Sequence, residues 1–174
     1  MNQATWETVR ELMLPYDGGA SQIHVLGIAK SEITHTLSSI EKGTTDPIVT
    51  LLANKVLDYN INLKDLHADV ISFSKVTDGQ TTIRTILFQT AVVTFDIWGE
   101  ITSDTFDLEV WFWADQLFTD NESKNQKRFS VLLGLLDKIT SNGECKCILT
   151  PSEASDPLED LEKGYGVLLD IKSA

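Results

Sequence analysis

The chain of 174 residues carries 26 acidic and 14 basic side chains, a net charge of −12 at pH 7, and 42% of its residues are hydrophobic. The hydrophobic content argues against a disordered chain, and the excess of acids argues against nucleic acid and membranes as partners, because both repel a protein without a cationic surface. The length is that of one compact unit, so we predict a single globular domain over residues 1–174.

The sequence favours a cytoplasmic location. Residues 1–16 lack the basic stretch and apolar run of a secretory signal, and no apolar run reaches the roughly 20 residues that span a bilayer. Cys145 and Cys147 are the only cysteines, too few for the disulfide framework of a small secreted protein. We therefore expect a protein of a reducing compartment.

The first third of the chain predicts a group of short helices. Apolar residues recur at helical spacing in residues 5–14, which Pro15 ends, and again in 31–43, where Gly43 closes the helix. Residues 46–56 open on an Asp-Pro pair, which is typical of a helix start, and their apolar residues also fit a helical stripe. The last two segments predict an αα-hairpin, and residues 23–29, between the first two helices, form a short apolar run that suits a strand.

From residue 68 the apolar period changes to two, which predicts a β-meander. Asp78 and Gly79 form a dipeptide that hairpin turns favour. Because residues 80–101 are too long for one average strand, we expect a bend or bulge near residues 89–91. The predicted strands are residues 68–77, 80–90, 91–101 and 105–118.

The last third predicts a long helix, a strand, a short helix and a closing strand. The helix follows Ser123 and ends at Asn142 and Gly143, with the strongest apolar stripe of the chain. The segments after it are a strand over 145–150, a helix that opens at Asp156 and a strand over 165–171. The predicted fold class is α+β: an antiparallel β-meander sheet of about four to six strands, packed by a long helix in the C-terminal half, with an N-terminal group of short helices.

Residues 85–123 contain no lysine or arginine but hold eight acids, with Trp98, Trp111 and Trp113. Such a stretch repels itself, so it makes physical sense if a partner supplies the positive charge. The acids are Asp96, Glu100, Asp104, Asp107, Glu109, Asp115, Asp120 and Glu122. Asp104 falls in the turn between two strands, and the last two acids fall at the start of the long helix, where acids favour the helix dipole.

Strand alternation places the remaining five acids on one side of the predicted sheet, with the three tryptophans. The expected opposite pairs are Glu100 with Asp107, Trp98 with Glu109, Asp96 with Trp111, and Thr94 with Trp113. The predicted partner-binding residues are Asp96, Trp98, Glu100, Asp107, Glu109, Trp111, Trp113 and Asp115. In the alternative interpretation the tryptophans pack beneath a helix such as 5–14, while the acids lie in solvent at the edge.

Other candidate sites are weaker. Cys145 and Cys147 lack the second ligand pair that a zinc site needs, and the three histidines show no matching spacing. Glu144 and Lys146 have a spacing found in metal-dependent nucleases, but the net charge repels such a substrate. We predict no catalytic residue, no metal and no cofactor.

These observations predict a protein-binding domain and not an enzyme. The favoured hypothesis is an inhibitor or immunity-type protein, bacterial or from a phage, that binds a basic protein such as a toxin or nuclease through the acidic and tryptophan face. Its physical logic resembles that of bacterial immunity proteins and of phage-encoded inhibitors, although no motif assigns the chain to a family. The alternatives are a small acidic dimer, similar to a secretion chaperone, that binds an effector segment, and an enzyme of unrecognised type.

Overall fold

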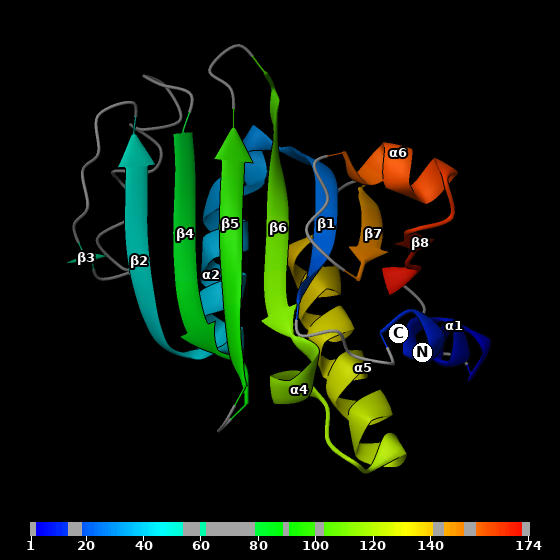
Figure 1. Ribbon diagram of the computed structural model, residues 1–174. Coiled ribbons are helices and arrows are strands. Elements are labelled where there is room, and N and C mark those ends of the chain that lie inside the picture. The colour runs from blue at the N-terminus through cyan, green and yellow to red at the C-terminus, as the bar shows by residue number, and fades with distance from the viewer. Residues whose placement is uncertain are drawn as a thin grey trace.

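The computed structural model describes residues 3–13, 19–53, 60–61, 79–88, 91–99, 103–140, 145–151 and 156–171. Its centre is one eight-stranded antiparallel sheet in the order β3-β2-β4-β5-β6-β1-β7-β8 (Figure 1). The strands are β1 (Ala20–Ala29), β2 (Thr45–Ala53), β3 (Asn60–Ile61), β4 (Gly79–Ile86), β5 (Val92–Gly99), β6 (Thr105–Trp113), β7 (Lys146–Thr150) and β8 (Val167–Leu168). The predicted α+β class is confirmed.

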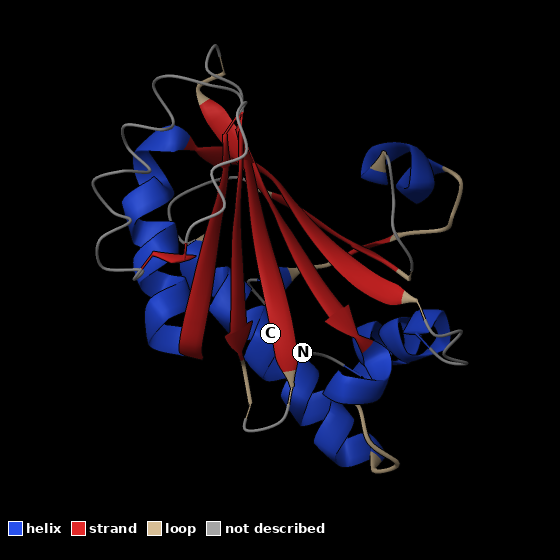
Figure 2. Ribbon diagram, turned by 60° about the vertical axis from the view of Figure 1, so that its left-hand side comes forward, coloured by secondary structure: helices blue, strands red, loops and turns tan. Residues whose placement is uncertain are grey.

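The helices are distributed unequally over the two faces of the sheet. They are α1 (Gln3–Met13), α2 (Ile33–Gly43), α4 (Ala114–Leu117), α5 (Glu122–Ile139) and α6 (Pro157–Glu162), with a 3₁₀ turn, η1 (Lys30–Glu32), before α2. In Figure 1, α2 and α5 lie behind the sheet, and Figure 2 shows α2 and α6 on opposite sides of it. No helix of the described residues is long and apolar enough to cross a membrane.

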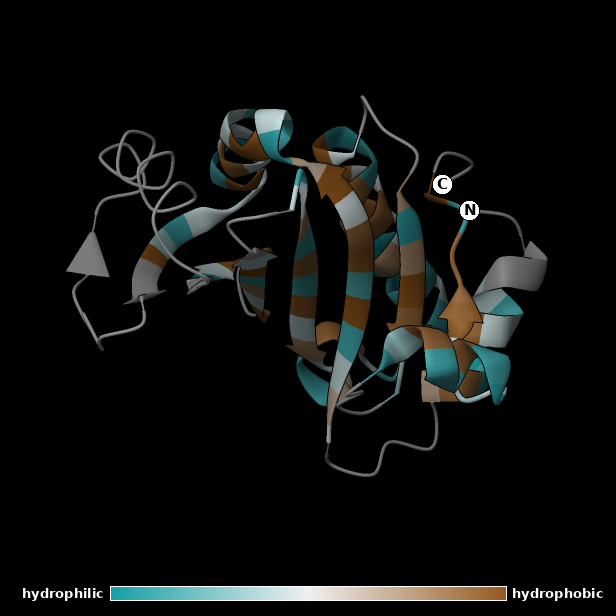
Figure 3. Cartoon of the chain, turned by 90° about the horizontal axis from the view of Figure 1, so that it is seen from above, coloured by the Kyte–Doolittle hydropathy of each residue, from teal (hydrophilic) through white to brown (hydrophobic). Residues whose placement is uncertain are grey.

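The core lies between the sheet and the helices α2 and α5. Along β6 every second side chain is buried, and the same alternation appears as coloured bands along the central strands in Figure 3. The buried residues Phe95 of β5, Val110 of β6 and Leu133 of α5 belong to one apolar cluster. A period of two on a strand that packs against an amphipathic helix produces this arrangement, as the sequence predicted.

Residues 46–56 do not form the predicted helix. Thr45–Ala53 is strand β2, which pairs with β4 and β3, so the predicted αα-hairpin is wrong. Asp46 has a φ of 51°, a left-handed conformation, and lies where the register with β4 shifts, so it is no helix N-cap. A short run of β-branched and leucine residues fits a strand as well as a helix, and pairing with β4 decides the outcome.

The remaining strand predictions differ in detail. The strands predicted over 80–90 and 91–101 correspond to β4 and β5, an antiparallel pair, so the chain reverses between them, where the Leu87 N–H donates to the Ala91 carbonyl, and does not merely bend. The closing strand is shortened to β8, and the strand predicted over 68–77 lies outside the described residues. The predicted strand over 23–29 is confirmed as part of β1, which pairs with β6 and β7.

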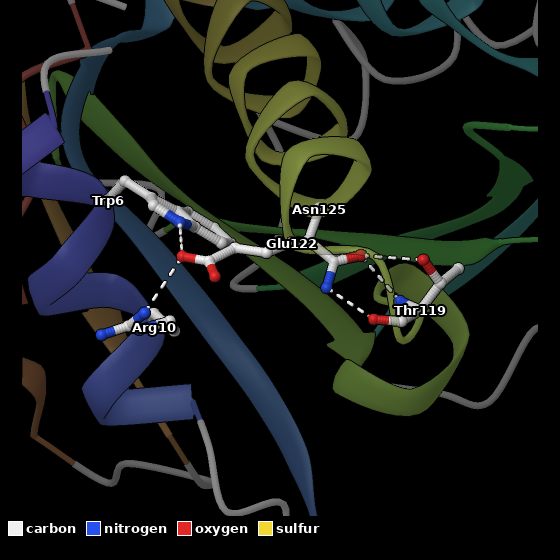
Figure 4. A network of polar contacts seen from close by, with 5 residues as sticks. All are labelled: Trp6, Arg10, Thr119, Glu122 and Asn125. Carbon is white, nitrogen blue, oxygen red and sulfur yellow. Dashed lines mark hydrogen bonds and ion pairs between the residues drawn. The ribbon is translucent and has the colours of Figure 1, made fainter.

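Helix α1 packs near the start of α5, and Figure 4 shows the polar contacts of this junction. Glu122, the first residue of α5, accepts a hydrogen bond from the Trp6 indole at 3.3 Å and lies 3.0 Å from Arg10. The Trp6 ring also meets Phe118 edge-on, with the ring centroids 6.0 Å apart. Glu122 therefore has its positive partner within the chain, and Asn121 caps the helix by accepting from the backbone N–H of Lys124.

Candidate partner-binding face

The side chains predicted to bind a partner lie on the sheet face that is turned away from α2 and α5. Along β5 and β6 they alternate with the apolar residues that enter the core, so they point to the near side of the sheet in Figure 1. We call this surface the acidic-tryptophan face. Its residues are Asp96, Trp98, Asp107, Glu109, Trp111 and Trp113.

The predicted pairing across this face is wrong by two residues. Asp96 lies opposite Glu109, and Trp98 lies opposite Asp107, whereas we expected Trp98 to lie opposite Glu109. The reason is that the turn is centred one residue earlier than expected, since the numbers of opposite residues sum to 205, as in Gly99 with Phe106, and not to 207. A shift of two keeps every side chain on the same face, so the predicted residues that lie on β5 and β6 share one face although their pairs differ from those expected.

Two predicted residues are not placed on this face. Glu100 lies outside the described residues. Asp115 is not on a strand, because β6 ends at Trp113 and Asp115 lies exposed in helix α4. The strand predicted over 105–118 is therefore too long, and its last residues form α4, whose Ala114 and Leu117 enter the core.

The tryptophans are not covered by helix α1. Trp98 is 43% exposed, Trp113 is 36% exposed and Trp111 is half-buried. Helix α1 instead places Trp6 against Phe118 and Phe129. The alternative in which a helix such as 5–14 packs over these tryptophans is therefore wrong.

The acids of the face are crowded and partly withdrawn from water. Asp96 is buried, and burial raises the pKa of its opposite neighbour Glu109. The nearby charges of Asp96 and Asp107 raise the pKa of Glu109 further, while the indole N–H groups of Trp98 and Trp111 lower it. A positive charge delivered to this group would remove the repulsion, and it would meet a carboxylate in surroundings where ion pairs are stronger than in water.

The indole N–H of Trp111 has an unusual environment. Its Nε1 atom is buried and makes no hydrogen bond of normal geometry in the described part of the chain. It is nevertheless close enough to Glu109 to favour the ionised carboxylate. A buried donor without a well-formed hydrogen bond costs free energy, so the Trp111 N–H stabilises the folded state less than a fully paired donor would.

Asp107 has a structural as well as an electrostatic role. Its Oδ1 atom accepts a hydrogen bond of 2.8 Å from the backbone N–H of Gly27 on β1. Gly27 has a φ of 81° and lies where the register between β1 and β6 shifts, between Val25 and Ile28. Only glycine adopts this conformation readily. The bulge takes the Gly27 N–H out of the regular hydrogen bonding between strands, and the Asp107 carboxylate accepts its hydrogen bond instead.

His24 was not predicted as part of the site. It lies opposite Glu109 on β1, with Nδ1 3.7 Å from the Glu109 carboxylate and Nε2 3.3 Å from the Thr150 hydroxyl. Burial lowers the pKa of His24 to about 4, and the negative charge of Asp160 on α6 partly opposes this effect. At neutral pH His24 is therefore uncharged and does not neutralise Glu109. The signal in the sequence was the alternation of Gln22 and His24 with apolar residues, which marks a second polar strip beside β6.

Glu109, His24 and Thr150 lie in the order of a catalytic triad, with a carboxylate, a histidine base and a hydroxyl nucleophile, but their geometry does not suit that chemistry. His24 and Thr150 are both about 1% exposed, and the distance from His24 to Glu109 is too long for a hydrogen bond. Burial also raises the pKa of Cys147 to about 12, so its thiol stays protonated. Over the described ranges, no three His, Cys, Asp or Glu side chains are arranged to hold a metal ion.

Cations are scarce around the acidic-tryptophan face. The described residues of β1, β2, β5 and β6 contain no lysine or arginine, whereas β4 carries the exposed Arg84 opposite Thr94, and β7 carries the exposed Lys146 on the same side of the sheet as Ile148. The other acid-rich element next to the face is α6, where Lys163 lies 2.6 Å from Glu159. The acids of the acidic-tryptophan face therefore have no cation on their own strands, β5 and β6, and the strand cations of the open side lie on β4 and β7.

The geometry defines an α+β protein in which one face of an antiparallel sheet packs on helices and the other carries an acidic, aromatic surface. No family model and no curated protein matches the chain. One chain of the 1.75 Å crystal structure of the toxic C-terminal tip of CdiA from Pseudomonas aeruginosa in complex with its immune protein has a similar fold. The TM-score is 0.55 at 13% sequence identity, and the match covers 79% of this chain and 89% of that chain. At this identity the likeness concerns the fold.

Proposed function

We propose that this chain is an immunity-type inhibitor that binds a basic toxin protein through the acidic-tryptophan face. The observation that carries the proposal is the group of Asp96, Asp107 and Glu109 beside the exposed Trp98, on strands without a cation of their own. Support also comes from the fold, which is similar to that of a chain from a complex between a toxin and its immune protein.

The chemistry of the face suits a partner rich in lysine and arginine. A cation that approaches Glu109 and Asp107 forms ion pairs, and its side chain lies near the Trp98 ring, where a cation is attracted to the aromatic face. Tryptophan and arginine are the residues that most often dominate protein interfaces. In a basic nuclease the same cations bind the phosphates of the substrate, so an acidic protein seated on them blocks access. The proposed inhibitor acts in the cytoplasm.

The test begins with the tagged protein expressed in its native cell. Proteins that co-purify at low and at high salt are identified by mass spectrometry, and the basic protein recovered is then purified. We expect a stoichiometric basic partner whose retention weakens as salt rises, because screening reduces charge complementarity.

The partner is then offered to variants of the face. Trp98→Ala and Glu109→Gln should each raise the Kd about tenfold to a hundredfold, since each removes a central contact. Val131→Ala, at an exposed position on α5, is the matched control and should bind normally. Normal binding by both face variants would overturn the proposal, as would a failure of the intact protein to protect cells that express the partner.

A further inference from the structure

A second exposed surface continues the acidic-tryptophan face toward the β8 edge of the sheet. Glu109 lies opposite His24 of β1, His24 lies opposite Ile148 of β7, and Ile148 lies opposite Leu168 of β8. Directly opposite residues of an antiparallel pair share one face of the sheet. Leu168 is therefore on the same side of the sheet as Glu109, at the end of one row of side chains.

Helix α6 lies on this side of the sheet and contacts β7. A Cβ atom on Gly166, in the turn after α6, would come within 3.3 Å of the Cγ2 atom of Ile148. Asp160 of α6 is close enough for its charge to act on His24, which is buried together with Ile148. The outer surface of α6 thus adjoins the acidic-tryptophan face.

Exposed hydrophobic side chains are concentrated on this side of the molecule. In the described part of the chain, the large ones are Ile48, Trp98, Trp113, Val131, Leu158, Tyr165 and Leu168. Six of these seven lie on the open face of the sheet or on α6 and the turn after it, and Val131 on α5 is the exception. Tyr165 and Leu168 are the most exposed, at 65% and 57%. Helices α2 and α5 cover the other face of the sheet, so these apolar side chains lie on the side where a partner protein has access to the sheet.

The charge of α6 matches that of the acidic-tryptophan face. Residues 156–163 contain four acids, Asp156, Glu159, Asp160 and Glu162, and one cation, Lys163. The cation is engaged within the helix by Glu159. Lys146 of β7 is exposed on the same side, but acids outnumber cations on α6 as they do on β5 and β6, so both surfaces combine exposed apolar side chains with net negative charge and suit the same kind of protein.

We propose that α6, Tyr165 and Leu168 form the second half of the interface, and that the same basic protein contacts them with apolar side chains flanked by lysine or arginine. The inference rests on the proposed function, because it extends that interface. In this extended interface the partner contacts α6 and the β8 edge as well as β5 and β6.

A photo-cross-linking experiment tests this extension. Benzoylphenylalanine is placed at Tyr165 and, as the matched control, at Val131, and each protein is irradiated with the purified basic protein recovered in the salt-dependent capture. We expect a cross-link from position 165 and none from position 131. The double variant Tyr165→Ala, Leu168→Ser should raise the Kd about tenfold, with an unchanged circular dichroism spectrum because both side chains are exposed.

The outcomes separate the two proposals. If Trp98→Ala weakens binding but position 165 gives no cross-link and the double variant binds normally, the extension is wrong and the proposed function stands. If the double variant weakens binding and Trp98→Ala does not, the partner binds α6 and the acidic-tryptophan face is not its site. Recovery of no basic protein contradicts both proposals.

Discussion

Two acidic residues on the open face of the sheet lower the stability of the folded protein. Asp96 and Glu109 lie directly opposite each other, and like charges in that position destabilise an antiparallel pair. Burial already raises the pKa of Glu109, so its ionised form at neutral pH is less favourable in the folded state than in the unfolded chain. An arrangement that lowers stability is expected where a binding surface requires it.

We therefore predict that Glu109→Gln stabilises the protein and weakens binding. At pH 7 the free energy of unfolding should rise by about 0.5 kcal/mol, the usual size of a cross-strand charge effect. Urea denaturation measures the change, and the Kd is measured in parallel. Asp115→Asn, in the exposed helix α4, is the control and should alter neither quantity. A less stable Glu109→Gln protein would contradict the prediction.

We predict that the protein loses stability in mild acid because of His24. Between pH 6.5 and about 4 the unfolded chain binds a proton at this residue and the folded chain does not, so the free energy of unfolding falls as the pH falls through this window. The decrease reaches about 3 kcal/mol at most, and the raised pKa of Glu109 partly offsets it, because the folded state takes up that proton first.

Urea midpoints at pH 7, 6 and 5 measure this effect. In His24→Gln, which keeps a polar group next to Thr150, the midpoint should change less with pH than in the parent protein. Parallel curves for the two proteins would show that His24 titrates normally.

Among the elements, α5 depends on a small polar junction at its start. Oδ1 of Asn125 accepts from the backbone N–H of Thr119 at 2.7 Å, and its Nδ2 donates to the Thr119 carbonyl at 2.7 Å (Figure 4). Both ends of the amide are used, and the side chain is buried. The contacts hold the connection between α4 and α5 while Trp6 and Phe118 pack nearby.

We predict that Asn125→Asp lowers the free energy of unfolding by about 1–3 kcal/mol. A carboxylate keeps the size of the side chain but loses the donor, so the Thr119 carbonyl remains without its partner. Asp120→Asn, at an exposed residue of the same connection, is the control and should have little effect. Chemical denaturation followed by fluorescence gives both values.

The elements also show what the sequence predicts well and what it does not. Strong periodicity located α5, β6 and the two faces of β5, because burial on one side dictates which side chains alternate. It could not distinguish a strand from a helix at β2, where the deciding contact is β4, about thirty residues away in the chain. Nor could it fix the pairing of Asp96, since two registers that differ by two residues bury the same core.

For a related reason, local sequence patterns do not predict that His24 lies beside the candidate site. β1 meets β6 through contacts that span about eighty residues of sequence, as between Gly27 and Asp107. Such pairing depends on strand order, and strand order is set by the whole sheet rather than by any one segment. The sequence therefore predicts which residues share a strand face, and less well which strands are neighbours.

For the whole molecule, the net charge of −12 should be detectable at the exposed tryptophans. We predict that caesium quenches their fluorescence more than iodide does, when each ion is compared with its action on free tryptophanamide. The acids around Trp98 attract the cation and repel the anion, whereas Trp6 is buried and contributes to neither. Neutral acrylamide serves as the control for access, and equal relative quenching by the two ions would contradict the prediction.

The place of β1 in the sheet has a consequence for the order of folding. This strand is made early in synthesis, yet it lies between β6 and β7, and Ser21 bonds to the carbonyl of Pro151 across 130 residues of sequence. Folding that depends on such distant pairs is slow, because a long loop must close before the contacts form. On the ribosome β1 waits for its second neighbour until β7 has emerged, so a chain truncated before residue 146 keeps one edge of β1 unpaired and prone to aggregation.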